Sequence, residues 1–323
     1  MTRPDKRQTR APDITVLNGG TQTTVQDAGR PGHRHLGIPR SGAADRLSFA
    51  VANHLVGNRW DAPALECALG GLHLRFERDA TIAISGAQMW AQVQGMNVDT
   101  NRAVDVEAGD ILTLSYAREG CRSYVAVAGG LEATEFLGSV STYLPAQLGG
   151  IEGRALRAGD GLELAGEPET GRRTLPKGYV PFLSNHAVLR ARSGPEFDAL
   201  CAQSRRYLFT TPFIATSATD RMGSRLRGDR IVTQEPHAMT SSPLLPGTLQ
   251  CPPDGQPILA LADGHCTGGY ARGLHVIQAD QWLLGQIAPG MRISFRRCFD
   301  DEAPEILETR NAVWSTLIPG FSF

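Results

Sequence analysis

The chain has 323 residues, of which 41% are hydrophobic and 20% charged, with a formal net charge of −1. This composition is that of one large or two ordinary folded domains and excludes a disordered chain. The near-neutral charge excludes recruitment to nucleic acid or anionic membrane by a global field. Only Lys6 and Lys177 are lysines. Neither follows a methionine, so we do not expect biotin to be attached to this chain.

The N-terminal residues are polar and lack the apolar stretch of a secretory signal. No apolar run approaches the roughly 18 residues of a membrane span. The six cysteines are scattered without a Cys-x-x-Cys pair, as in proteins that keep reduced thiols. We therefore predict a cytoplasmic protein.

Short apolar segments separated by glycine, aspartate and asparagine turns dominate the sequence and predict a mainly β fold. The clearest predicted strands are Ile14–Leu17, Leu72–Phe76, Thr81–Ile84, Ile111–Leu114, Tyr124–Val127, Ile258–Leu261 and Met291–Phe295.

Three helices are predicted. Ser41 is the expected N-cap of a helix that runs to about Val56. Pro195 is expected to open a second helix that ends near Tyr207. A third begins at Asp300 or Asp301, near the C-terminus.

A stretch rich in glycine, proline and charge, residues 166–183, is the best candidate for a linker. It divides the chain into an N-terminal β-rich subdomain, residues 12–165, and a C-terminal subdomain, residues 184–323, that includes the last helix.

The segment Thr24–Asp45 combines glycines and prolines with many ionisable side chains and has no hydrophobic period. Such a segment is either a ligand-binding loop on a rigid scaffold or a well-solvated surface loop. Its polar side chains are Gln26, Asp27, Arg30, His33, Arg34, His35, Arg40 and Asp45.

A second polar segment, Gly247–Tyr270, lies far downstream. The predicted strand before it delivers Asp263 at its end, and backbone N–H groups of Thr267, Gly268, Gly269 and Tyr270 could line an anion site.

Three further charged residues are candidates for the same chemistry. Arg221 and Arg225 suit bidentate capture of a carboxylate or phosphate, or they form a surface ion-pair network. Glu66 stands in an apolar run, where it is either a satisfied buried acid or a base with a raised pKa.

Several catalytic templates do not occur. The sequence lacks a G-x-x-x-x-G-K-[ST] phosphate loop and a G-x-S-x-G nucleophile motif. His33 and His35 could share a metal, but no third ligand is placed by the sequence, and we predict no metal site. His265 and Cys266 are adjacent, so in a strand their side chains would point to opposite faces.

The motifs taken together resemble the biotin-dependent carboxyltransferase-like family, also called allophanate hydrolase subunit 2. The resemblance runs in order from about Ile14 to Phe295. The motifs that carry it are TVQDAGRPGHRHLGIPRSGAAD, ANHLVGNRWDAPALE, VAGGL with FLGSVST, GRALRAGD, DRMGSRL and PPDGQPILALADGHCTGGY.

The resemblance implies a cyclophilin-like β-barrel architecture. It also implies a separately encoded partner of similar fold, which is of the allophanate hydrolase subunit 1 type or, in 5-oxoprolinase, of the B type. Members of the family occur in three settings. They serve in ATP-dependent 5-oxoprolinase, together with a further (β/α)-barrel-type A component, as half of the carboxyltransferase region of urea carboxylase, or as a regulator that antagonises a sporulation-kinase inhibitor.

Our favoured hypothesis is a subunit of a 5-oxoprolinase-like complex, which uses ATP to open a lactam and yields glutamate. A carboxyltransferase that accepts carboxyl from biotin on another protein, and a non-catalytic regulator, are the alternatives. In the first hypothesis Asp27, Asp263 or Glu66 transfers protons, while the anion binders are Gln26, Arg30, Arg221, Arg225 and residues 267–270. It requires both polar loops to wall one cavity.

Overall fold

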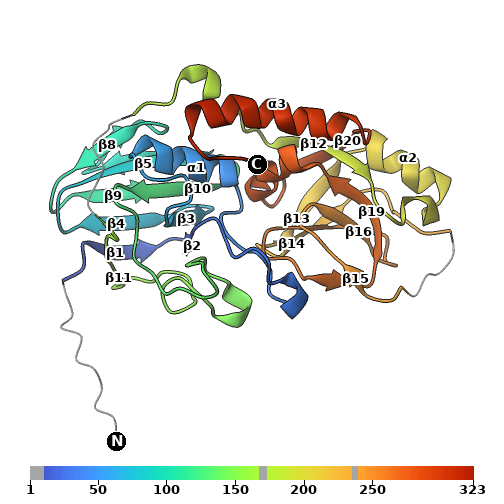
Figure 1. The fold of residues 1–323 in the computed structure, drawn as a ribbon, viewed down its shortest axis with the longest axis horizontal. Helices are drawn as coiled ribbons and strands as arrows, with labels where there is room; N and C mark the ends of the chain where they lie inside the picture. Colours follow the sequence, from blue (N-terminus) through green and yellow to red (C-terminus); the bar gives the residue numbers. More distant parts are fainter. Residues whose placement is uncertain (1–10, 167–172, 235–238) are drawn as a thin grey trace, which may run out of the picture.

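The computed structural model describes residues 11–166, 173–234 and 239–323, and it shows two β-rich units lying side by side (Figure 1). The mainly β fold, with few helices and a closed barrel, confirms the predicted fold class. No helix among the described residues is long and apolar enough to cross a membrane.

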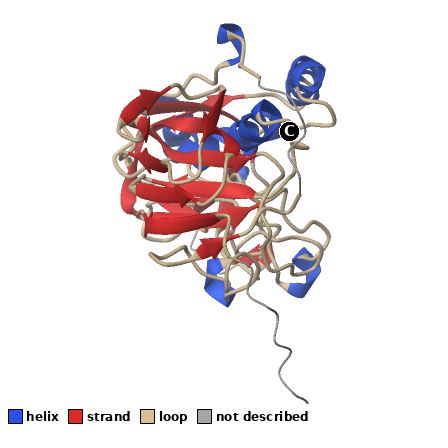
Figure 2. Ribbon diagram, turned by 90° about the vertical axis from the view of Figure 1, so that its left-hand side faces the viewer, coloured by secondary structure: helices blue, strands red, loops and turns tan. Residues whose placement is uncertain are grey.

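The N-terminal unit contains two antiparallel sheets (Figure 2). In spatial order, the strands of the six-stranded sheet are β11 (Gly161–Leu162), β1 (Ile14–Gly19), β4 (Leu72–Phe76), β9 (Ile111–Leu114), β6 (Ala91–Val93) and β7 (Met96–Val98). Those of the five-stranded sheet are β2 (Gln22–Gln26), β3 (Ala64–Ala68), β10 (Glu119–Val127), β5 (Ala80–Gln88) and β8 (Ala103–Val106).

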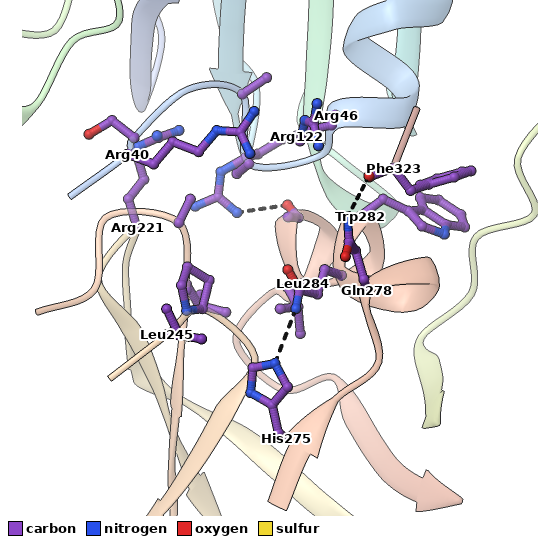
Figure 3. A pocket seen from close by; sticks show the side chains of 18 of the residues that line it. Arg40, Arg46, Arg122, Arg221, Leu245, His275, Gln278, Trp282, Leu284 and Phe323 are labelled. Atoms are coloured by element: carbon purple, nitrogen blue, oxygen red, sulfur yellow. Dashed lines mark hydrogen bonds between the residues drawn. The ribbon is translucent and has the colours of Figure 1, made fainter. Parts of the chain in front are cut away.

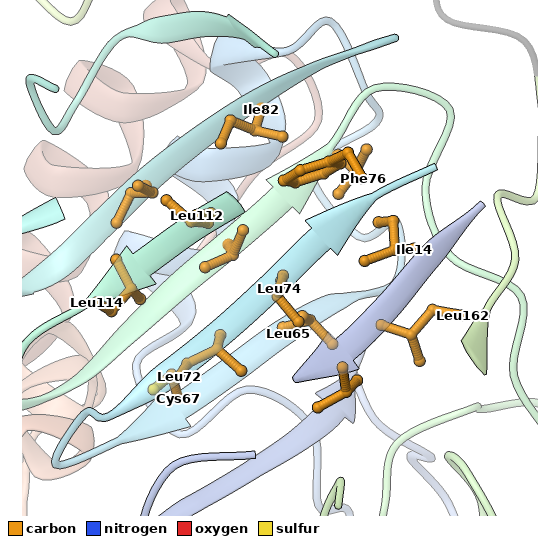
Figure 4. Close-up of a cluster of buried hydrophobic side chains, with 14 of the residues drawn as sticks. Ile14, Leu65, Cys67, Leu72, Leu74, Phe76, Ile82, Leu112, Leu114 and Leu162 are labelled. Atoms are coloured by element: carbon orange, nitrogen blue, oxygen red, sulfur yellow. The ribbon is translucent and has the colours of Figure 1, made fainter. Parts of the chain in front are cut away.

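The two sheets of this unit enclose a continuous apolar core (Figure 4). In β4, Leu72, Leu74 and Phe76 are buried, while Arg75 between them is exposed. This period of two places alternate side chains on one face of the sheet. From the other sheet, Leu65 and Ile82 pack into the same core.

Helix α1 (Arg46–Leu55) covers the other face of the five-stranded sheet and packs on β5 and β10. The predicted N-cap, Ser41, was wrong. The helix is capped by Asp45, whose side chain accepts a hydrogen bond from Ser48 N at 2.9 Å. Ser41 instead has a positive φ of 54°, in a turn that precedes the helix.

The C-terminal unit is a closed seven-stranded barrel. Its strands in spatial order are β12 (His186–Ser193), β19 (Ala271–Val276), β16 (Thr248–Cys251), β17 (Ile258–Ala260), β14 (Gly223–Arg227), β13 (Phe213–Thr219) and β20 (Arg292–Arg297). β12 and β20 are parallel, and the other neighbours are antiparallel.

The second helix begins later than predicted. After Pro195 the chain forms only a short 3-10 turn, η4 (Phe197–Ala199), and α2 (Ala202–Thr210) starts after Cys201. Leu200 has extended backbone angles, which separate the two segments.

The last helix, α3 (Glu302–Leu317), begins after Asp301 as predicted and lies across the top of Figure 1. Its Trp314 packs in one cluster with Phe49 of α1 and Trp282 of the long 3-10 segment η5 (Gln278–Gln286). This cluster joins the two units. The domain boundaries stay a prediction, and within the proposed linker residues 167–172 lie outside the described residues.

Candidate functional site

The two polar loops meet where the β units adjoin. Arg34 reaches from the first loop to the barrel, where its Nη2 donates to Leu244 O and, at 3.3 Å, to His265 O. The segments are more than two hundred residues apart in sequence. The arrangement that the favoured hypothesis requires is therefore present.

A buried ion cluster crosses the same boundary. Arg221, from the barrel, donates from Nε to Asp263 Oδ2 at 2.7 Å and from Nη1 to Glu66 Oε1. Its Nη2 also donates to the carbonyl of Gly42 at 2.6 Å. Since all three groups are almost fully buried, this arginine ties the barrel to the first loop and to β3.

Glu66 is the centre of this cluster. Arg122 Nε lies 3.2 Å from its Oε1, and Tyr124 Oη and Ala44 N each donate to its Oε2 at 2.8 Å. Burial alone would raise the pKa of Glu66, but Arg221 and Arg122 outweigh it and hold this pKa below its usual value. These contacts favour a positioning role for Glu66 over proton transfer.

Asp27 is also fully engaged. Its carboxylate accepts hydrogen bonds from Ser139 Oγ at 2.6 Å, Gly29 N at 2.7 Å and Val140 N at 2.8 Å, and from Ser141 Oγ. These bonds anchor the loop around residues 136–142 to the first polar loop. They too favour positioning over proton transfer.

Arg30 has no exposed surface, and it donates from Nε to Phe136 O at 3.2 Å and from Nη2 to Ser141 O. Its Nη1 is buried without a partner. Burial lowers the pKa of Arg30, while the charges of Asp27 and Asp263 oppose that shift. Arg30 thus lies close to both polar loops.

The other predicted anion binders lie elsewhere. Arg225 forms an exposed ion pair with Asp254 at 2.6 Å. Gln26 is buried and donates to Thr24 Oγ1 at 2.9 Å and to Thr142 O at 3.1 Å, which leaves its Oε1 unpaired. The structure does not bring Arg225 to the other candidates.

The predicted backbone cradle is part of a small ribbon. Thr267–Gly268 form β18, which pairs with β15 (Ser242–Pro243). Gly269 and the exposed Tyr270 follow it. Among the described residues, none of the four borders the cavity described next.

A cavity of about 390 Å³ lies between the two units (Figure 3). One wall comes from the first loop and the start of α1. The opposite wall comes from the barrel and η5. Residues that line it include Arg34, Arg40, Ser41, Arg46, Arg122, Arg221, Leu245, Pro246, Leu261, His275, Gln278, Gln281, Trp282, Leu284 and Phe323.

Five arginines border this cavity, and no aspartate or glutamate of the described residues does. Arg122 and Arg221 are neutralised by the buried cluster. Arg34, Arg40 and Arg46 have no carboxylate within 4.0 Å in the described part of the chain. Burial lowers the pKa of Arg46 to about 10, and the neighbouring Arg40 lowers it further. The wall therefore carries uncompensated positive charge.

Several hydrogen-bond donors of the wall are buried without a partner. They are Arg34 Nη1, Ser41 Oγ, Arg46 Nε and Trp282 Nε1. An unpaired buried donor is costly unless a ligand or water satisfies it. Because all four can donate, the complementary ligand presents several acceptor oxygens, as a carboxylate or phosphate does.

His275 lies across the cavity from the arginines (Figure 3). Gln281 Nε2 is 3.5 Å from its Nε2, and its Nδ1 is 3.1 Å from Thr248 Oγ1. Burial, and then the charge of Arg192, lowers the pKa of His275. The imidazole is therefore neutral near pH 7.

Sequence reasoning missed Arg46, His275 and Trp282 as cavity residues. Arg34 and Arg40 stood out only as members of a polar loop. Arg46 begins a helix, and His275 and Trp282 follow a strand pattern and a general aromatic pattern, so no local signal distinguished them. The described residues contain no group of three potential metal ligands.

Two β units with an arginine-lined cavity between them define a class of small-anion-binding proteins. A family profile, the carboxyltransferase domain, subdomain A and B, matches residues 36–297. The chain belongs to this family, as the sequence resemblance predicted.

Two curated relatives carry the same name. The chain is 39% identical to the C subunit of 5-oxoprolinase from Escherichia coli (strain K12), over 90% of this chain and 93% of that one. It is 36% identical to the 5-oxoprolinase C subunit of Haemophilus influenzae, over 93% and 96%. The name of these relatives implies further subunits in their complexes.

A solved structure extends the similarity to a second enzyme. The K. lactis urea amidolyase superposes with a TM-score of 0.90 at 28% identity. The match covers 96% of this chain but only 20% of the urea amidolyase chain.

Proposed function

We propose that this chain is one component of a cytoplasmic, ATP-dependent enzyme complex of the 5-oxoprolinase type. The proposal is carried by the 39% identity over 93% of the length of the Escherichia coli relative. The arginine-lined cavity supports it, because 5-oxoproline carries a carboxylate that guanidinium groups bind well. The six unpaired cysteines agree with a reducing compartment.

In this proposal ATP phosphorylates the lactam oxygen and leaves as ADP. Water then adds to the activated carbon, the C–N bond breaks, and the nitrogen takes up a proton. A second water hydrolyses the resulting acyl phosphate to glutamate and phosphate. The residues of this chain bind and orient the anionic substrate, and Arg40 and Arg46 are the groups best placed for this. Charge that develops on oxygen is stabilised by such preorganised donors.

Two partners are proposed with it. One is a fold-related subunit of the 5-oxoprolinase B type, and the other is a (β/α)-barrel-type subunit of the A type. ATP would act through the assembled complex, and biotin is not attached to this chain.

Reconstitution tests the proposal. The full chain is mixed with purified A-type and B-type partners, 5-oxoproline and ATP, and glutamate and ADP are measured. We expect equimolar products only from the full set. No glutamate above the level seen without this chain would refute the proposal.

The similarity to urea amidolyase supports an alternative, half of a carboxyltransferase that receives carboxyl from biotin on another protein. It predicts transfer from a carboxylated biotin carrier to urea, without ATP in the transfer step. Such transfer by the chain and its B-type partner, in the absence of 5-oxoproline turnover, would favour this alternative. A non-catalytic regulatory role stays a prediction from the sequence.

A further inference from the structure

We propose that the cavity selects a small organic dianion, an acid with two negative charges, over a monocarboxylate of the same size. The inference rests on the proposed function and deepens it, because a lactam carboxylate that has received a phosphoryl group carries more than one charge. It names the class of ligand that this chain itself holds.

The first argument is the balance of charges on the arginine wall. The pairs Arg122 with Glu66 and Arg221 with Asp263 cancel. The remaining guanidinium groups belong to Arg30, Arg34, Arg40 and Arg46, and the remaining nearby carboxyl groups to Asp27 and Asp45.

Among the described residues this wall therefore keeps a surplus of two positive charges when both acids are ionised. A monoanion would neutralise only one of them. Because the charges lie partly out of water, where screening by salt and solvent is weak, a second negative charge on the ligand adds substantially to binding.

The second argument is the set of unpaired donors. Ser41 and Trp282 are 6% and 7% exposed, and Ser41 Oγ and Trp282 Nε1 have no hydrogen-bond partner. Arg34 Nη1 and Arg46 Nε are also buried and unpaired. Since these donors come from the first loop, α1 and η5, one carboxylate cannot reach them all. Two anionic groups, or one phosphoryl group with three oxygens, can.

The third argument is the shape of the cavity. Leu245, Pro246, Leu261 and Leu284 line it beside the arginines, and they provide apolar contact for a carbon skeleton. A bare inorganic ion would leave this surface empty. The ligand is thus an organic acid with its charges toward the arginines and its carbon body toward the barrel.

Binding to the full chain tests the inference without any partner present. Titration calorimetry at low ionic strength and about pH 7.5 compares valerate, glutarate and propyl phosphate, since a phosphate monoester carries close to two charges there. We expect glutarate or propyl phosphate to bind at least about tenfold more tightly than valerate. Whichever of the two is preferred identifies the source of the charges, two carboxylates or one phosphoryl group.

Matched variants assign the preference to the cavity. Arg40→Gln and Arg46→Gln should each remove most of the preference for the dianion and leave valerate binding nearly unchanged. Arg225→Gln, outside the cavity, should leave all three affinities unchanged. Thermal unfolding of each variant shows that it is folded.

Equal affinity for valerate and both dianions overturns the inference, as does the failure of all three to bind. An equal loss in Arg225→Gln overturns it as well. The proposed function fails separately: an intact dianion preference with no 5-oxoproline turnover in the complex contradicts that function and leaves this inference standing.

Discussion

Two sets of arginine side chains meet at the boundary between the units, and they differ in what faces them. Arg122 and Arg221 face carboxylates at close range. Arg40 and Arg46 face the cavity. Buried pairs of this kind contribute little net stability compared with apolar residues, but they fix geometry, and removing one partner is costly. The first set is therefore structural, and the second is available to a ligand.

The buried cluster gives a stability prediction. Arg221→Gln leaves Glu66 and Asp263 buried without their shared cation, and we expect it to lower the free energy of unfolding by about 3–5 kcal/mol. Arg225→Gln breaks only an exposed pair with Asp254 and should change it by less than about 0.5 kcal/mol. Urea denaturation of both variants measures the difference. Equal effects would contradict a structural role for the cluster.

Asp45 gives a pH prediction. Burial raises the pKa of this carboxyl to about 6, although hydrogen bonds from Ser48 and Gln286 oppose the shift. The folded state thus favours the protonated form, so stability from this group is present below its unfolded pKa of about 4 and is lost as pH rises through about 6.

Asp45→Asn should remove that dependence. We expect wild type to lose up to about 3 kcal/mol relative to the variant between about pH 4 and pH 7. Denaturant unfolding at several pH values measures this difference, and any constant cost of the substitution cancels. Parallel curves for the two proteins would show that Asp45 titrates normally.

Among the elements, the helix starts show where local sequence sufficed. The third helix was predicted at its true start because two aspartates precede a continuous helical pattern. The first was misplaced because Ser41 and Asp45 are both good caps. Only the folded turn, which puts Ser41 at positive φ, decides between them.

The short helix η1 (Arg34–Leu36) and the ribbon of β15 and β18 form a contact across the cavity mouth. Arg34 supplies its hydrogen bonds to Leu244 and His265. We expect Arg34→Ala to speed amide hydrogen exchange in residues 33–37 by about tenfold, with little change in global stability. His35→Ala, on the same exposed turn, is the control. Unchanged exchange in Arg34→Ala would show that this contact does not hold the loop.

At the scale of the whole molecule, Gln286 connects the units. Its Nε2 donates to Asp45 Oδ2 at 2.7 Å and to Arg122 O at 2.9 Å. Its Oε1 accepts from Cys121 N at 2.9 Å and Arg122 N at 3.1 Å. Together with the shared apolar cluster around Trp282, this predicts that both units unfold in one cooperative transition.

Gln286→Ala removes these bonds and leaves several buried partners unsatisfied. We expect a loss of about 2–4 kcal/mol and a broader or split transition in scanning calorimetry. Gln281→Ala, in the same 3-10 segment, should keep a single transition. Two separate transitions in the wild-type protein would refute the predicted coupling.

The sequence by itself determined the β-rich class, most strands, the family and the two polar loops, because each depends on local alternation, turn residues or short motifs. Only the tertiary structure decided which of the polar side chains face a ligand. Asp27, Glu66 and Asp263 resemble free acids in sequence, yet each is engaged by partners up to about two hundred residues away. Arg46 and His275 gain a role because two units close around them. Charge pairing and burial are properties of neighbours in space, and neighbours in space are set by the complete fold.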